Sequence, residues 1–178
     1  MTAAGQLDVA FVHEVEGSPL RVPDGLELRV LMEREPQFVS MSLDHPAARS
    51  PVVELQDLAG DRWTVDPSVD GEWDGLRRVF ARAGLTPQVL HADYHTAASL
   101  IVSGEAVAPC QPTSGPRDDM AIRPLLGDPL AVRLLLATRP GEHAEAYEDL
   151  RAAYREAALG TPPYRAWLSR QGSPLLVA

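Results

Sequence analysis

The sequence has a single cysteine, Cys110, and therefore cannot form a disulfide within one chain. A lone cysteine is typical of proteins that work in a reducing compartment such as the cytosol. No apolar run approaches the roughly 20 residues needed to cross a bilayer, and the first residues, MTAAGQLD, lack the basic and apolar regions of a secretion signal. These absences predict a cytoplasmic protein that does not bind a membrane.

Basic residues are few and scattered. The 178 residues contain 16 Lys and Arg against 25 Asp and Glu, which gives a formal net charge of -9. A surface for nucleic acid needs clustered positive charge to meet the phosphates. The sequence therefore predicts no direct nucleic-acid binding by this chain.

Familiar enzyme signatures are also missing. The chain contains no Gly-rich phosphate loop, CxxC pair, HExxH or GxSxG. We therefore expect no cofactor and no metal. With 45% hydrophobic and 23% charged residues, the composition is that of a globular protein long enough to build a core.

Short β-rich runs alternate with helical periods along the chain. Strands are predicted at residues 7–12, 26–32, 37–41, 62–65, 87–91, 105–109, 120–124 and 130–137, the last of these nearly all apolar, as in a strand covered on both faces. Helices are predicted at 71–84, with Trp73, Leu76 and Phe80 on one stripe, and at 97–104, capped by Thr96. A longer helix is predicted at 142–159 and a short one at 164–168. The strand-helix-strand order of residues 62–109 predicts parallel pairing with crossovers, hence an α/β fold.

Five stretches resemble, in order and spacing, the effector-binding portion of LysR-type transcriptional regulators. They are GQLDVAFV (5–12), EPQFVSMSLDHPAA (35–48), VELQDLAGDRWTV (53–65), ARAGLTPQVLHADYHTAASLIVSGEAVAPCQPT (81–113) and IRPLLGDPLAVRLLLATR (122–139). Each stretch is short and mostly apolar, so the resemblance depends on all five occurring in the family's order and spacing.

The resemblance implies a fold similar to periplasmic binding proteins, with two α/β lobes joined by crossover strands and an effector in the cleft. Residues 1–50 and 138–178 would form a first, incomplete lobe with the C-terminal helices, and residues 51–137 a second lobe with the return strand. HPAARSPVVELQDLAG (45–60) would lead into the second lobe, and LAVRLLLATR (130–139) would lead back. The implied partners are a small organic effector, an acid or an aromatic compound, and a second copy of the chain.

The sequence departs from the family pattern at its start. Neither the winged helix-turn-helix and linker helix of the family nor the first strand and helix of the first lobe can be recognised before GQLDVAFV.

Two functions stay open. The chain is either the sensor domain of a LysR-type regulator, acting through lobe closure and a change of oligomer, or a cofactor-free enzyme built on the same fold.

The candidate ligand-binding residues lie where strands end. A helix N-terminus at His95 and Thr96 offers free N–H groups to an anion, although simple capping explains Thr96 equally well. Pro67, Ser68 and Asp70 follow another strand and could contact a ligand or only cap the next helix. The remaining candidates lie at the expected edges of the cleft and are Pro109, Cys110, Gln111, Phe11 and Val12.

For the enzyme alternative, the candidate acid, base or nucleophile is His95, Asp93 or Cys110. In HADYH (91–95) the two histidines and the aspartate would share a face only in an extended strand, and no further strong ligand follows at metal-site spacing. The favoured interpretation of HADYH is a strand end that leads into a helix. A reactive Cys110 would need a neighbouring base or a helix N-terminus to lower its pKa, and the sequence places none beside it.

Overall fold

The computed structural model describes residues 9–69, 71–114, 117–140 and 144–176. Its strands are β1 (Val9–Val15), β2 (Glu27–Pro36), β3 (Phe38–Ser42), β4 (Arg62–Val65), β5 (Gln88–His91), β6 (Ala108–Cys110), β7 (Met120–Pro124) and β8 (Ala131–Thr138). Its α-helices are α1 (Glu72–Arg82), α2 (Tyr94–Val102), α3 (Ala144–Gly160) and α4 (Pro162–Gln171). Short 3-10 helices span Pro46–Arg49, Leu55–Leu58 and Pro174–Leu176. None of the described helices is long and apolar enough to cross a membrane.

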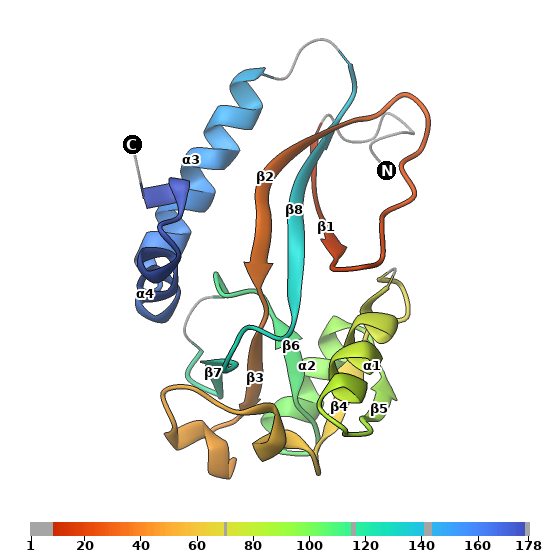
Figure 1. Ribbon diagram of the computed structural model, residues 1–178, viewed down its shortest axis with the longest axis vertical. Helices are drawn as coiled ribbons and strands as arrows, with labels where there is room; N and C mark the ends of the chain where they lie inside the picture. Colours follow the sequence, from red (N-terminus) through yellow and green to blue (C-terminus); the bar gives the residue numbers. More distant parts are fainter. Residues whose placement is uncertain (1–8, 70, 115–116, 141–143, 177–178) are drawn as a thin grey trace.

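One half of the fold is an antiparallel sheet in the order β1-β8-β2, with α3 and α4 packed beside it (Figure 1). As predicted from its apolar run, the central strand β8 is buried along nearly its whole length. The core between sheet and helices includes Leu134 of β8, Tyr154 of α3, and Tyr164 and Leu168 of α4. These helices therefore depend on the sheet for the burial of their apolar side chains.

The other half holds two smaller sheets. Strand β3 pairs antiparallel with β6 and β7, while β4 pairs parallel with β5 and forms a parallel bridge from Trp63 to Val107. Trp63, Leu76 and Phe80 are fully buried in the core of this half. The predicted parallel pairing across the α1 crossover is thus confirmed for β4 and β5. The predicted strand at 105–109 runs parallel to β4 at Val107, while its end continues into β6, which pairs antiparallel with β3.

The chain passes between the halves at two places, from β2 into β3 and from β7 into β8 (Figure 1). The hydrogen-bonded partners change sheet at each passage. The lobe boundaries at residues 50/51 and 137/138 stay a prediction.

Several local predictions needed correction. Trp73 lies on the exposed side of α1, because the buried stripe of that helix consists of Gly75, Leu76, Val79 and Phe80. On α3, Tyr154 and Ala158 are buried as expected but Leu150 is exposed. Thr96 does not cap α2. The cap is Asp93, whose Oδ1 accepts the Thr96 N–H at 2.8 Å, so the helix begins three residues earlier than predicted. Residues 7, 8, 70, 142 and 143 lie outside the described part of the chain.

The His-Pro step at residues 45 and 46 has a structural role that the sequence did not reveal. Nδ1 of His45 accepts the N–H of Ala47 at 3.1 Å and so caps the first 3-10 helix. Its Nε2 therefore carries the proton and donates to Asp61, at 3.2 Å from Oδ2. This imidazole ties the chain after β3 to the turn before β4.

Gly71, which precedes α1, offers a test of how closely the halves approach. Its φ is +81°, and an added β-carbon would overlap Cβ of Ser18 in the chain between β1 and β2. Gly25 has the same φ of +81° with nothing near its position, so it is a matched control for backbone strain alone. We expect Gly71→Ala to lower the free energy of unfolding by about 1–3 kcal/mol more than Gly25→Ala does, in urea denaturation. Equal losses would mean that Ser18 moves aside at no cost.

Candidate functional site

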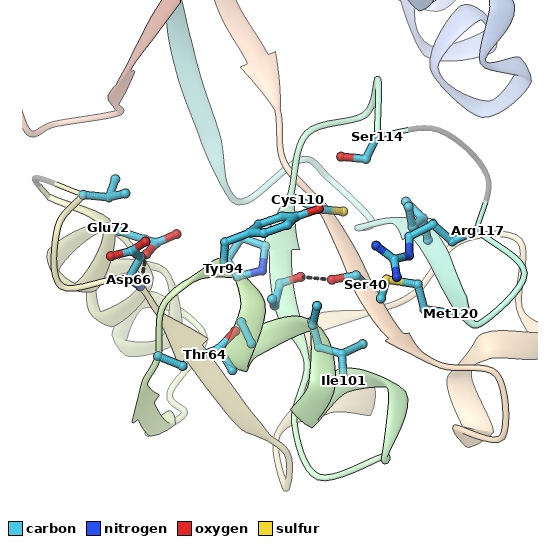
Figure 2. A pocket seen from close by; sticks show the side chains of 17 residues that line it. Ser40, Thr64, Asp66, Glu72, Tyr94, Ile101, Cys110, Ser114, Arg117 and Met120 are labelled. Atoms are coloured by element: carbon cyan, nitrogen blue, oxygen red, sulfur yellow. Dashed lines mark hydrogen bonds between the residues drawn. The ribbon is translucent and has the colours of Figure 1, made fainter. Parts of the chain in front are cut away.

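A cavity of about 250 Å³ lies in the second half of the fold, beside the carboxyl ends of β4 and β5 (Figure 2). Ligands of α/β folds collect at this end of parallel strands. Residues of β3, β4, α1, α2, β6 and β7 and of the chain between them form its wall: Ser40, Thr64, Asp66, Val69, Glu72, Ala92, Tyr94, Ala97, Ala98, Ile101, Ala108, Pro109, Cys110, Ser114, Arg117, Met120 and Ile122. Most of these side chains are apolar or small, so the cavity suits a compact organic molecule.

Two carboxylates, Asp66 and Glu72, stand together on one side of the cavity (Figure 2). Oε2 of Glu72 accepts the backbone N–H of Asp66 at 2.6 Å, and Oδ1 of Asp66 accepts the hydroxyl of Ser68 at 2.6 Å. Burial raises the pKa of Glu72, the N–H of Asp66 opposes that rise, and the negative charge of Asp66 adds to it. This side of the cavity therefore disfavours a negatively charged ligand group.

Arg117 lies on the opposite side, and Tyr94 lies between the two (Figure 2). The guanidinium of Arg117 donates from Nε and Nη2 to the two carboxylate oxygens of Asp119, both at 2.8 Å, and this pairing holds the pKa of Asp119 below its ordinary value. Tyr94 is 69% exposed. An aromatic ring that is open to solvent at the mouth of an apolar cavity can stack on a planar ligand.

The floor of the cavity includes Ser40 of β3 and Cys110 of β6. The hydroxyl of Ser40 donates to the carbonyl of Ala108 at 3.2 Å, across the β3–β6 pair. Burial raises the pKa of the Cys110 thiol to about 12, so the thiol is neutral at physiological pH. It serves as a small polarisable wall group and not as a thiolate nucleophile.

Of the ligand-binding residues predicted from sequence, Pro109 and Cys110 line this cavity. The other predicted residues lie elsewhere. His95 and Thr96 are exposed on the first turn of α2, Pro67 and Ser68 lie in the exposed turn after β4, and Gln111 follows β6. Phe11 and Val12 belong to β1 in the other sheet, where Phe11 stacks on Tyr154 at 6.0 Å between ring centroids. The roles of these residues as ligand contacts stay predictions.

Sequence reasoning missed Asp66, Glu72, Tyr94 and Arg117. Asp66 directly follows the strand RWTV, a position that could have singled it out. Tyr94 lies inside HADYH but was passed over in favour of the flanking histidines. No local signal marks Arg117, because only the fold brings it to the cavity.

The structure assigns ordinary structural roles to the proposed enzyme residues. As favoured from the sequence, HADYH is a strand end that leads into α2, with Asp93 as the cap. The Thr96 N–H holds the pKa of the Asp93 carboxyl below its ordinary value. Within the described ranges, no group of three or more His, Cys, Asp and Glu side chains could hold a metal ion. Of the three proposed enzyme residues, only Cys110 lines the cavity, and its thiol is neutral.

Comparisons with known proteins agree with this architecture. The model of the LysR substrate binding domain family matches residues 1–159. The small neutral protease regulatory protein of Streptomyces coelicolor is 69% identical over 174 residues, which cover 97% of this chain and 54% of that protein. The chain thus spans about half the length of this relative.

Solved structures show the same fold at low sequence identity. HinK, a LysR family transcriptional regulator from Pseudomonas aeruginosa, is 17% identical with a TM-score of 0.64, over 84% of this chain and 53% of HinK. The BenM effector binding domain with its effector benzoate is 18% identical with a TM-score of 0.56, over 96% of this chain and 73% of that one.

The mixed α/β fold with a cavity at the ends of parallel strands is the fold of LysR effector-binding domains. The chain belongs to the LysR substrate binding domain family, whose members have a fold like that of periplasmic binding proteins. The resemblance seen in the five sequence stretches is confirmed.

Proposed function

We propose that this chain is the sensor domain of a LysR-type transcriptional regulator and that the cavity beside β4 and β5 binds its small-molecule effector. The observation that carries the proposal is the mostly apolar cavity, walled by six strands and helices, with polar groups on opposite sides. The high identity to the Streptomyces coelicolor regulatory protein supports a role in transcription regulation.

The charges of the cavity restrict how an acidic effector can bind. Asp66 and Glu72 repel an anionic group on their side, whereas on the other side Arg117 offers the N–H groups that its pairing with Asp119 through Nε and Nη2 leaves over. A compact aromatic acid would therefore place its carboxylate toward Arg117 and its ring under Tyr94, over the apolar wall.

The regulatory output of binding is part of the same proposal. Effector binding would draw the two halves of the fold together through the β2–β3 and β7–β8 passages and change the pairing of chains. In the described part of the sheet β1 is an edge strand with only β8 as a neighbour, and Phe11 on it is 41% exposed, which supports pairing with another copy. A regulator of this kind works in the cytoplasm, and the net charge of -9 supports our expectation that this portion does not contact DNA itself.

A ligand screen tests the proposal. Small organic acids and aromatic compounds would be tested for an increase in the melting temperature, starting with benzoate and its uncharged amide, and positive compounds would be titrated by calorimetry. A ligand that binds only the folded chain raises its melting temperature, and the rise grows with the logarithm of ligand concentration once that concentration exceeds Kd. The proposal predicts at least one saturable one-to-one binder, and a library at millimolar concentration that yields none would refute it.

Thr96→Val tests the predicted anchor at the start of α2. If the Thr96 hydroxyl bonds the effector, its removal is expected to weaken binding by about 1–3 kcal/mol, the cost of an unmade hydrogen bond at a bound ligand. Valine keeps the backbone N–H that donates to the Asp93 cap, so the variant should fold and lose only the contact of the Thr96 hydroxyl with the Asp93 carboxylate. Thr86→Val, in the exposed loop after α1, is the control. Unchanged affinity in Thr96→Val would move the anchor to the hydroxyls that line the cavity, such as those of Ser40 and Thr64.

A further inference from the structure

Glu35, near the end of β2, is completely buried, with 0% of its surface exposed. Its Oε1 accepts hydrogen bonds from the hydroxyls of Tyr154 on α3 and Tyr164 on α4, the second at 3.2 Å. Its Oε2 is buried and has no hydrogen-bond partner among the described residues. A carboxyl group thus joins both C-terminal helices to the strand that leads from one half of the fold to the other.

No described positive charge balances this carboxyl group. Arg34, beside it in sequence, points away and donates to the carbonyl of Asp128, and Arg155 of α3 donates to the carbonyl of Leu175. On β8, Glu35 pairs with Val132. Of the other basic side chains on β8, α3 and α4, Arg133 pairs with Glu14 and Glu33, whereas Arg151, Arg165 and Arg170 are exposed. The acidic side chains of α3, which are Glu145, Glu148, Asp149 and Glu156, are exposed as well, and the thiol of Cys110 on β6 is neutral. Within the described ranges, the hydroxyls of Tyr154 and Tyr164 are the only hydrogen-bond partners of the Glu35 carboxyl group.

The hydrogen-bond geometry favours the neutral acid. If Glu35 is ionised, both tyrosines donate to Oε1 and the negative charge still leaves Oε2 unpaired, which is costly in a buried site. If Oε1 is protonated, it can donate to Tyr154, which donates to Tyr164 at 2.9 Å, which in turn donates to Sδ of Met32 at 3.1 Å. Every hydroxyl then has an acceptor, and Oε2 is left only as an uncharged carbonyl oxygen.

The rings of Tyr154 and Tyr164 also contact aromatic residues of two strands, one in each half of the fold. The ring of Tyr164 meets Phe38 of β3 edge-on at 6.2 Å between centroids, and the ring of Tyr154 stacks on Phe11 of β1 at 6.0 Å. A change in the hydrogen bonds of Glu35 therefore acts on helices that touch strands on both sides of the β2–β3 passage.

We propose that Glu35 is protonated at neutral pH and acts as a proton-dependent latch, which holds α3 and α4 on the β2–β3 passage and is released when the proton is lost. The proposal does not depend on whether the cavity binds an effector. Its physiological meaning is that alkaline conditions loosen the C-terminal helices at the passage between the two halves.

The direction of the pH effect follows from linkage. Burial raises the pKa of Glu35 from its ordinary value of 4.5 to about 8, against a smaller opposing effect of the Tyr164 hydrogen bond. The folded state therefore holds a proton that the unfolded state has lost between these two values, so the contribution of Glu35 to stability falls as pH rises through this window. Below the window both states are protonated and above it both are ionised, so the contribution is constant there.

The test compares the full chain with Glu35→Gln and with Glu33→Gln, an exposed glutamate on the same strand, across this pH window. The amide has the shape of the neutral acid and cannot ionise. We expect the melting temperature of the wild type and of Glu33→Gln to fall, relative to Glu35→Gln, as pH rises. Amide hydrogen exchange in α3 and α4, corrected for intrinsic rates, should lose protection by at least about tenfold between pH 6 and pH 9 in the wild type relative to Glu35→Gln. Parallel profiles for wild type and Glu35→Gln would overturn the proposal.

A direct titration keeps the test decisive if Glu35→Gln fails to fold. The carbon resonances of side-chain carboxyl groups in the wild type report each protonation step, and Tyr164→Phe, which removes one donor, supports the assignment of Glu35. A carboxyl group that titrates near pH 8, and whose titration changes in Tyr164→Phe, supports the latch. Titration of every glutamate near 4.5 overturns it.

Discussion

Replacing Trp63 with alanine is expected to lower the free energy of unfolding by about 3–5 kcal/mol, the usual cost of truncating a fully buried large aromatic residue. Trp63 is 0% exposed on β4, and its ring meets Phe80 edge-on at 5.3 Å between centroids. Its Nε1 also donates to the carbonyl of Leu58 at 3.5 Å. Because Thr64 and Asp66 follow it, the loss should also disturb the cavity wall.

Urea denaturation followed by circular dichroism measures this loss. Trp73→Ala is the matched control, since Trp73 is 36% exposed on α1. We expect that control to change stability by less than about 1 kcal/mol, as surface substitutions generally do. Similar losses in the two variants would mean that the β4–α1 core does not hold this half of the fold together.

Filling the cavity with Ala98→Trp is expected to weaken binding of the best compound from the ligand screen by at least about 100-fold, or about 2.8 kcal/mol. Ala98 is half-buried on α2 and lines the cavity of about 250 Å³, which is too small to hold both an indole ring and an aromatic effector. Calorimetric titration gives the affinity, and circular dichroism shows whether the variant folds.

Ala152→Trp, on the exposed side of α3, adds the same ring away from the cavity and should bind with unchanged affinity. If Ala98→Trp folds and binds as tightly as the wild type, the effector site lies elsewhere. The groove between β2 and the C-terminal helices, lined in part by Leu31, Arg34 and Trp167, would then be examined next.

The predictions that succeeded rest on interactions local in sequence. The apolar run of residues 130–137 predicted a strand covered on both faces, and β8 is the buried centre of its sheet. Arg62–Val65 and Met120–Pro124 form strands with the predicted bounds. Such patterns succeed because side-chain alternation and periodicity report which face of an element is buried. Together with the five stretches in shared register, they sufficed to indicate the family.

The predictions that failed depended on which other elements pack against a helix in the folded structure. Thr96 and Asp93 can both cap a helix, and in the structure Asp93 caps α2. Trp73 and Leu150 fit apolar stripes, yet the partner elements cover other sides of α1 and α3. Periodicity identifies a stripe but does not show where the packing surface ends.

By itself the sequence determined the element types, the α/β class and the family. Each of these follows from patterns that are local in sequence, such as side-chain periodicity and the order of short motifs. Only the tertiary structure decided that Asp66 and Arg117, 51 positions apart in the numbering, face each other across one cavity. It also decided that Glu35, in the polar-looking stretch EREP, is completely buried beneath two tyrosines more than 100 residues later. The physical reason is that burial, hydrogen-bond partners and the pKa of a side chain are set by the groups packed around it, and those groups come from distant parts of the chain.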